Sequence, residues 1–398
     1  MLSPRFARQV SLNVRYWQQR TAVVDDRLLG RLDGERENLF RAVSYGLGLE
    51  ATQRETAELV LQLAPLAEKR GYWDEWIGVL QRAVRVAAGV SPLRVALLNQ
   101  MGLLHRLRRE IQQAIGIHRQ ALAEAQAAGP AVLTDSTYFH LGTCFMEIRD
   151  YDTARLYANR ALVQFLARPG DAPDDKIGPA YNLLGLIALH TGDGETAVSR
   201  FRQAITHWAR CGDTTYLARA WNNLGMAQAG GQDWQAALAS YDQADAILAT
   251  TMSELDRVRV AINRGNVHYR MGNLADAAAA YRAANTPYLQ QSADRFHQAL
   301  IASNLGYVLT LLDELDEAHG WLRRGVALWR EQDDALMLAS ALLNTGLLAW
   351  RRGEETAAAA AYDEAEPLLL QHQDDAWGRE MLAELADRRQ KLAGELAA

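Results

Sequence analysis

Residues 221–244 read WNNLGMAQAGGQDWQAALASYDQA, and the fold class can be inferred from this stretch. Counted from Gly225, an alanine follows at +12, an aromatic residue at +16 and a second alanine at +19. Full copies of the pattern start at Gly185, Gly265 and Gly346, and copies with one or two substitutions start at Gly102, Gly142 and Gly306. Successive glycines lie 40, 43, 40, 40, 41 and 40 residues apart. The chain therefore contains a tandem array with a period of about 40 residues.

This pattern resembles the tetratricopeptide repeat, in which about 34 residues form a pair of antiparallel helices. The resemblance covers about residues 91–370, with longer units than the family norm. It implies an all-α fold, a right-handed superhelical solenoid of stacked helical hairpins with a concave groove. Small residues at the glycine and at +12 are expected to let two helices approach closely. The +16 aromatic is expected to fill the space beneath the next pair.

Four segments are predicted along the 398 residues. Residues 1–50 form an N-terminal helical segment, and residues 51–90 form a degenerate hairpin whose small residue is Ala64. Residues 91–370 form seven repeats, so at least seven hairpins and no sheet are expected there. Residues 371–398 form a capping helix, because a terminal repeat exposes one face to water.

The N-terminal part carries a second resemblance. Residues 32–43 and 71–76 are similar to the helical region that follows the nucleotide-binding and winged-helix domains of bacterial STAND-type regulators, which implies the sensor arm of such a protein. A P-loop requires G-x-x-x-x-G-K-[ST], and none of the lysines, at 69, 176 and 391, has that context. An NTPase domain, if this chain works with one, would be encoded elsewhere.

Composition argues against several classes of function. The net charge is −6, which gives no general attraction to nucleic acid, so direct contact with DNA or RNA is not expected. No paired histidines, thiolate pairs or converging catalytic groups can be assembled, so no cofactor, no metal and no enzyme activity are predicted. Cys144 is expected to be a buried structural thiol. No apolar span long enough for a membrane occurs, and a bacterial cytoplasmic protein is expected.

The polar residues on the first helix of each hairpin are the candidate binding residues. Asparagine stands two residues before the glycine in four successive repeats, although it is less favourable than alanine in a helix by roughly 0.5 kcal/mol. The family resemblance directs this position into the groove, where amides, arginines and aromatics can hold an extended peptide. The candidates are Arg219, Asn222, Asn223, Arg259, Asn263, Asn266, Tyr269, Arg270, Asn304, Tyr307, Asn344, Trp350 and Arg351. Alternatively, the asparagines form a ladder that links adjacent hairpins and binds nothing.

The leading functional hypothesis is a non-catalytic scaffold that binds a protein or peptide in its groove. It would serve as the ligand-sensing or regulatory arm of a bacterial signal-transduction or transcriptional regulator. A free-standing adaptor that assembles a protein complex is the alternative. An enzyme or an RNA-binding helical repeat is less favoured, because neither a catalytic set nor a basic groove can be built from the sequence.

Overall fold

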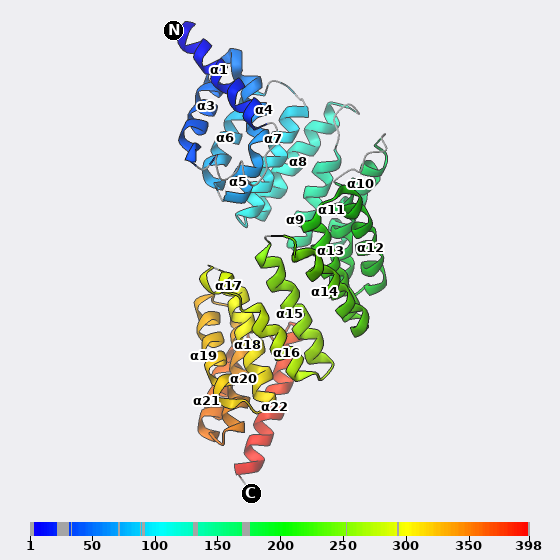
Figure 1. Cartoon of the computed structure of the whole chain (residues 1–398), viewed down its shortest axis with the longest axis vertical. Coiled ribbons are helices and arrows are strands. Elements are labelled where there is room, and N and C mark those ends of the chain that lie inside the picture. The colour runs from blue at the N-terminus through cyan, green and yellow to red at the C-terminus, as the bar shows by residue number, and fades with distance from the viewer. Residues whose placement is uncertain are drawn as a thin grey trace. The chain divides into compact units, whose positions relative to one another are not determined.

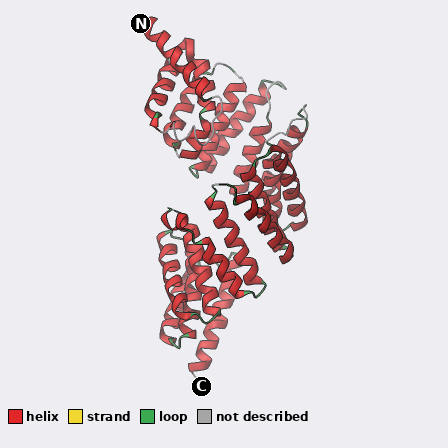
Figure 2. Ribbon diagram, viewed as in Figure 1, coloured by secondary structure: helices red, strands yellow, loops and turns green. Residues whose placement is uncertain are grey.

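A computed structural model describes residues 4–21, 32, 34–70, 72–87, 89, 92–129, 134–168, 176–251, 253–292 and 294–396. Helices make up nearly all of this part of the chain, and it contains no β-strand (Figure 2). The predicted all-α class is confirmed. None of the described helices is both long and apolar enough to cross a membrane.

Seven helical hairpins follow one another between residues 92 and 370 (Figure 1). In each hairpin two long helices pack along each other and are joined by a short turn. The pairs are α7 (Pro92–Leu107) with α8 (Ile111–Ala127), α9 (Asp135–Glu147) with α10 (Tyr151–Leu166), α11 (Ile177–His190) with α12 (Gly194–Cys211), α13 (Thr214–Gly230) with α14 (Trp234–Leu248), α15 (Glu254–Arg270) with α16 (Leu274–Ala284), α18 (Arg295–Leu311) with α19 (Leu315–Glu331), and α20 (Ala335–Arg351) with α21 (Glu355–Leu370).

The repeat glycine lies where the two helices of a hairpin pack against each other. A Cβ atom placed on Gly225 would lie 2.5 Å from Cε1 of Tyr241, inside van der Waals contact, so only glycine fits beneath this ring. Corresponding pairs, with Cβ distances of 2.6, 2.6 and 2.2 Å, are Gly185 with Phe201, Gly265 with Tyr281 and Gly346 with Tyr362. The expectation that the +16 aromatic fills the space beneath the next hairpin was therefore incomplete. Its ring packs on the glycine of its own hairpin.

The turn inside every hairpin uses a left-handed residue at the same position. Seven residues after the repeat glycine, φ lies between 62° and 80° in all seven hairpins; the residues are Arg109, Arg149, Gly192, Gln232, Gly272, Asp313 and Gly353, with φ of 65°, 62°, 77°, 62°, 80°, 65° and 74°. A left-handed residue after a helix satisfies its last carbonyl groups and reverses the chain. This conformation shortens the connection and brings the second helix back along the first.

The chain divides into two compact units, residues 1–211 and residues 212–398. This division falls inside the array that the sequence pattern treats as continuous. The first unit contains three hairpins preceded by helices α1 (Pro4–Arg20), α3 (Arg36–Gly48), α4 (Gln53–Gln62), α5 (Ala64–Arg70) and α6 (Trp73–Val86), with a 3₁₀ turn at Glu50–Thr52. The second unit contains four hairpins with α17 (Pro287–Gln291) and α22 (Ala376–Leu396).

The N-terminal helices share one apolar core with α7. Trp17 and Trp76 are almost fully buried in it, and α4 packs against both α6 and α7. The assignment of Ala64 as the small residue of a first helix was wrong. The helix breaks at Leu63, and Ala64 begins the separate helix α5.

Helix α22 covers the last hairpin by packing on α21 and α20 (Figure 1). Met381, Leu385 and Leu392 enter the apolar core of that hairpin. The buried guanidinium of Arg388 donates to the carbonyl of Leu343 in α20 and pairs with Glu384. Helix α22 thus covers the end face of the last repeat through buried apolar side chains and through the hydrogen bond from Arg388 to the backbone.

Candidate functional site

The candidate site lies on the first helices of the four hairpins in residues 212–398. Asn223, Asn263, Asn304 and Asn344 all stand two residues before a repeat glycine, and all four are half-buried. A helix places residues three and four apart on one face. Arg219 and Arg259 stand four residues before two of these asparagines, and Asn266 and Tyr307 stand three residues after two of them, so they extend the same polar face along the helices.

Two asparagines reach across to the preceding hairpin. Asn263 donates from Nδ2 to Oδ1 of Asn222 at 2.9 Å, which joins α15 to α13. Asn304 donates to Oδ1 of Asn266 at 3.3 Å, which joins α18 to α15. Each bond uses one of the two amide protons that an asparagine offers. The ladder alternative accounts for these two contacts without excluding binding.

The Asn266 side chain also accepts a hydrogen bond from its own hairpin. The hydroxyl of Tyr281, in α16, donates to its Oδ1 at 2.6 Å. Burial raises the pKa of Tyr281 above its usual value, so this hydroxyl stays protonated and remains a donor. The same ring packs on Gly265. Tyr281 therefore packs between the two helices of its hairpin and also orients the Asn266 amide on the candidate face.

A charged group lies at the start of α15. Asp256 is 4% exposed and accepts from Nε of Arg219 at 3.0 and 2.9 Å on its two oxygens. Arg259 lies 3.5 Å from the same carboxylate, and Ser253 donates to it at 2.5 Å. The side chains of Arg219 and Arg259 are 43% and 44% exposed. We call Arg219, Asp256 and Arg259 the charged centre; its two cations exceed its one carboxylate.

An exposed tyrosine extends the charged centre. The guanidinium of Arg219 lies 5.4 Å from the ring centre of Tyr216, whose side chain is 45% exposed. Cation–π contact of this kind holds the arginine in place while leaving its terminal nitrogens available. Neither Nη atom of Arg219 has a hydrogen-bond partner among the described residues.

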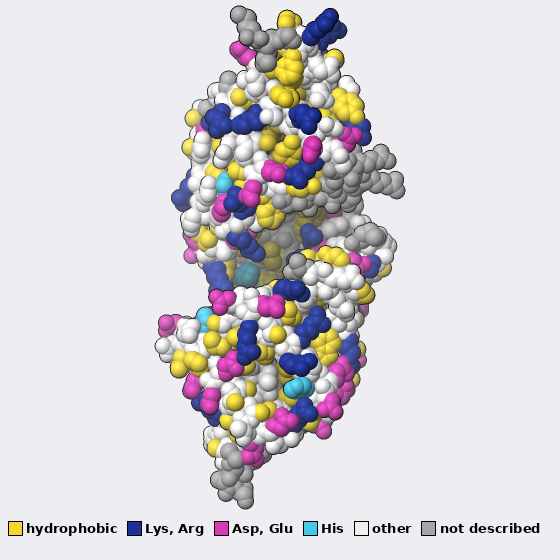
Figure 3. Space-filling view, turned by 90° about the vertical axis from the view of Figure 1, so that its left-hand side faces the viewer, with side chains coloured by type: hydrophobic (Ala, Val, Ile, Leu, Met, Phe, Trp, Pro, Cys, Tyr) yellow, Lys and Arg dark blue, Asp and Glu magenta, His cyan; other side chains and the backbone are white. Residues whose placement is uncertain are grey.

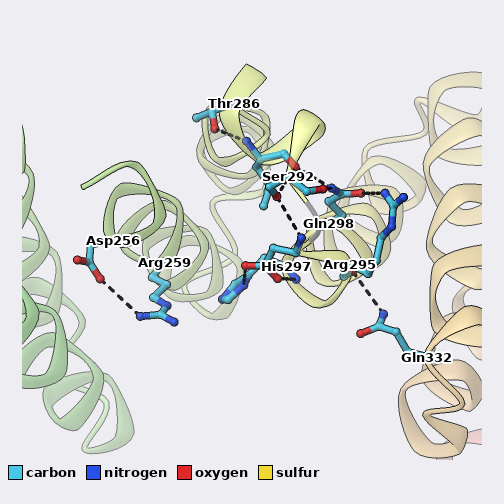
Figure 4. Close-up of polar contacts among 10 residues, drawn as sticks. Asp256, Arg259, Thr286, Ser292, Arg295, His297, Gln298 and Gln332 are labelled. Carbon is cyan, nitrogen blue, oxygen red and sulfur yellow. Dashed lines mark hydrogen bonds and ion pairs between the residues drawn. The ribbon is translucent and has the colours of Figure 1, made fainter. Parts of the chain in front are cut away.

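Helix α17 lies next to α15 and α18, and Figure 4 shows polar contacts around it. The buried amide of Gln298 donates to the carbonyls of Leu289 and Ser292, at 2.7 and 3.0 Å, and fastens α17 to α18. Arg295 donates to Gln298 at 3.0 Å, and Gln332 reaches the carbonyl of Arg295. Thr286 and Asp294 cap the two helices, and Asp294 also accepts from His297. The sequence signal for this insertion was Asn285-Thr286-Pro287, a helix stop followed by a helix start.

The remaining predicted residues differ in their surroundings. Tyr269 and Tyr307 meet edge to face with centroids 5.6 Å apart, and their hydroxyls are 3.3 Å apart. Burial raises the pKa of Tyr307. Arg351 lies 3.9 Å from Asp313, and Arg270 is exposed. The amide of Asn344 has no partner among the described side chains, and Trp350 is half-buried.

Reactive side chains do not converge in the part of the chain that the structure describes. It contains no group of three His, Cys, Asp or Glu residues that could hold a metal ion. Burial raises the pKa of the Cys144 thiol to about 12, as expected for a structural thiol rather than a nucleophile. Basic and acidic side chains are interspersed over the face shown in Figure 3, which has no continuous basic surface. Asp256 was missed by sequence reasoning, because one acidic residue at a helix start is also a common capping pattern.

Comparison with known proteins supports the fold. Residues 177–249 match the tetratricopeptide repeat family. A search of curated proteins finds no match. Among solved structures, a Signal Transduction ATPase with Numerous Domains (STAND) protein with a tetratricopeptide repeat sensor, from Pyrococcus horikoshii, is similar to 91% of this chain with a TM-score of 0.66 and 12% identity. The match covers 54% of that protein, so this chain spans about half its length.

Two further structures are similar over most of both chains. Aspartyl phosphate phosphatase F from Bacillus subtilis is 14% identical, with 92% of this chain and 95% of that chain covered and a TM-score of 0.55. A Rap protein complexed with competence and sporulation factor is 13% identical, with coverages of 85% and 93% and a TM-score of 0.57. At these identities the similarity establishes the fold, a tetratricopeptide repeat solenoid.

Proposed function

We propose that this chain, which has the tetratricopeptide repeat fold, is a non-catalytic scaffold that binds an extended polypeptide along the first helices of residues 212–398. The charged centre carries the proposal. Asp256 holds two arginines in place, yet both guanidinium groups remain nearly half exposed. An arginine with free terminal nitrogens can bind a carboxylate through two parallel hydrogen bonds. The polypeptide would therefore carry an aspartate or glutamate at this point.

The asparagines would contact the backbone of the same polypeptide. Asn263 keeps one amide proton after bonding to the preceding hairpin, and Asn344 keeps both. Amides spaced along a row of helices suit the repeating N–H and C=O groups of an extended chain. Tyr216, beside Arg219, would cover an apolar side chain next to the acidic residue.

The regulatory setting is the second part of the proposal. The resemblance of the N-terminal part to STAND-type regulators, and the fold shared with a STAND protein that has a repeat sensor, support a ligand-sensing arm in signal transduction or transcription control. Any nucleoside triphosphate hydrolysis would come from another domain. A free-standing adaptor is the alternative. An immunoblot of the native protein discriminates, because a regulator arm would migrate well above 44.2 kDa and an adaptor near that mass.

Selection from a random peptide library tests the binding function. Peptides enriched on the wild-type chain should share an acidic residue. They should bind the double variant Arg219→Gln, Arg259→Gln at least about tenfold more weakly, since one charge-assisted interaction of about 1.4 kcal/mol equals a tenfold change. Arg323→Gln, an exposed arginine on α19, is the matched control and should bind as the wild type does. Enriched peptides that lack acidic residues, or that bind the double variant equally well, would contradict the proposal.

A further inference from the structure

A polar stripe runs along one face of α15. Its four residues follow one another at intervals of four, three and four, which a helix places on one face; they are Arg259, Asn263, Asn266 and Arg270. Eleven residues separate the two arginines, which corresponds to three turns and about 16 Å of helix. Arg259 belongs to the charged centre, and Arg270 places a second cation at the other end of the stripe.

Arg270 differs from the arginine at the same repeat position in α20. That residue is Arg351, which lies 3.9 Å from Asp313 in the turn of the preceding hairpin. The next residue, Arg352, pairs with Asp316 of the same hairpin at 3.2 Å. Arg270 is exposed, and its side chain makes no ion pair or hydrogen bond within the described part of the chain. The guanidinium of Arg270 is therefore available to a group from outside the chain.

The repeat register explains why Arg270 lacks a carboxylate. Asp313 and Asp316 stand seven and ten residues after their repeat glycine. In the hairpin that precedes α15, the same two positions are Gln232 and Gln235. Amide side chains at both positions leave the positive charge of Arg270 without an acidic partner.

The acidic residues closest to this end of α15 in the repeat pattern are engaged elsewhere. Asp233 accepts from the backbone N–H of Ala236 at 3.2 Å as the N-cap of α14. Asp276, in the first turn of α16, lies 3.9 Å from His268. Neither carboxylate forms an ion pair with Arg270. Internal compensation of this cation is thus absent from the described residues.

We propose that the polypeptide bound at the charged centre carries a second aspartate or glutamate, whose side-chain carboxylate binds Arg270. This inference rests on the proposed function, because the charged centre fixes the first acidic residue. A free guanidinium can hold a carboxylate through two parallel hydrogen bonds. Between the two arginines the remaining amide proton of Asn263 would contact the polypeptide backbone.

The length of the stripe sets the spacing of the two acidic residues. An extended chain advances about 3.3 Å per residue, so about 16 Å corresponds to about five residues. Alternate side chains share one face of an extended chain. Separations of four and six residues therefore bracket this length and direct both acidic side chains toward α15. The proposed ligand is an extended segment with two acidic residues at such a separation.

Calorimetric titration of the full-length chain with synthetic peptides tests the spacing. Each acetylated and amidated twelve-residue peptide consists of threonine and serine, with one glutamate at position 2 and a second at position 4, 6, 8 or 10. The second glutamate at position 6 or 8 should tighten binding about threefold to fivefold over the single-glutamate peptide, the effect of one exposed ion pair. At position 4 or 10 the gain should be at most about twofold, since the two arginines cannot be engaged together. An equal gain at all four positions, or no gain at positions 6 and 8, would overturn the inference.

Three variants locate the second contact. Arg270→Gln should remove the gain at positions 6 and 8, whereas Arg323→Gln, an exposed arginine on α19, should retain it. Gln232→Asp should reduce the gain, because it supplies a carboxylate at the position that Asp313 occupies in the later hairpin. Thermal melts check that each variant is folded. A gain that survives Arg270→Gln would overturn the assignment.

The single-glutamate peptide separates failure of this inference from failure of the proposed function. If that peptide does not bind, or binds the double variant Arg219→Gln, Arg259→Gln as well as it binds the wild type, the charged centre is not the site and both proposals fail. If its binding depends on the charged centre but the second glutamate adds nothing at positions 6 and 8, only the role of Arg270 is excluded.

Discussion

The ring of Tyr241 packs directly on Gly225, so that a Cβ atom on this glycine would lie 2.5 Å from Cε1 of the tyrosine. The tyrosine is 1% exposed, and its ring joins the core shared by α13 and α14. Burial raises its pKa above the usual value. The glycine is thus required by a specific ring, and the +12 alanine, Ala237, is a buried neighbour rather than the closest contact.

Substituting Gly225 should destabilise the second unit. Gly225→Leu should lower the free energy of unfolding by roughly 1–3 kcal/mol, because the core has no room for the added atoms. Gly230→Ala, in the same helix but with open space at its Cβ, is the control and should raise stability by roughly 0.5–1 kcal/mol. Denaturant titrations compare the two. If both substitutions changed the free energy of unfolding equally, the contact with the Tyr241 ring would not be the reason that glycine is needed at position 225.

The asparagines should separate into two classes. Asn263→Ala and Asn304→Ala each remove a bond between hairpins, worth about 1 kcal/mol, against a gain of about 0.5 kcal/mol in helix propensity. Both should therefore be destabilising. Asn344→Ala removes no such bond and should be neutral or stabilising. Thermal melts measure these changes. Equal changes in stability for all three variants would argue that Asn263 and Asn304 do not link adjacent hairpins.

The left-handed turn positions predict a stabilising change. Gln232 has φ of 62°, a conformation that an L residue adopts at an energetic disadvantage of roughly 1 kcal/mol. Gln232→Gly should raise the free energy of unfolding by about 0.5–1 kcal/mol. The reverse change at the equivalent turn, Gly272→Gln with φ of 80°, should lower it by a similar amount. Calorimetric melts of both variants test this prediction. Stability changes of the same sign in Gln232→Gly and Gly272→Gln would contradict it.

The stacked rings of His118 and His140 predict a pH dependence of stability. Burial lowers the pKa of His140 to about 4 and that of His118 well below its usual range. The unfolded chain binds these protons near pH 6.5, so protonation favours unfolding between about pH 6.5 and 4. Stability should fall as the pH is lowered through this window. His140→Gln should flatten the dependence measured by melting; an unchanged slope would exclude His140 as a contributor.

The sequence predicts the hairpins well because their determinants are local and repeated. A glycine and an aromatic sixteen residues later are visible in any copy of the pattern. The left-handed turns were not predicted, since Arg109, Gln232 and Asp313 carry no glycine signal there. The break before Ala64 was also missed, because apolar residues continue across it.

The sites were harder to predict because they combine residues far apart in the chain. Asp256 becomes informative only when Arg219, 37 residues earlier, is seen beside it. Spacing identifies the positions that face the same way. Spacing alone does not show which of these side chains hydrogen-bond to each other and which can bind a ligand.

Site-specific crosslinking tests the central claim most directly. A photoreactive p-benzoylphenylalanine replacing Tyr216 would lie beside the charged centre, and the same group at Leu370, a similarly exposed residue on α21, is the control. Irradiation in native extract should crosslink the photoreactive group at position 216 to polypeptide segments that contain an aspartate or glutamate, and Arg219→Gln with Arg259→Gln should abolish these products. Products that are the same from both positions, or that survive loss of the two arginines, would contradict polypeptide binding at this face.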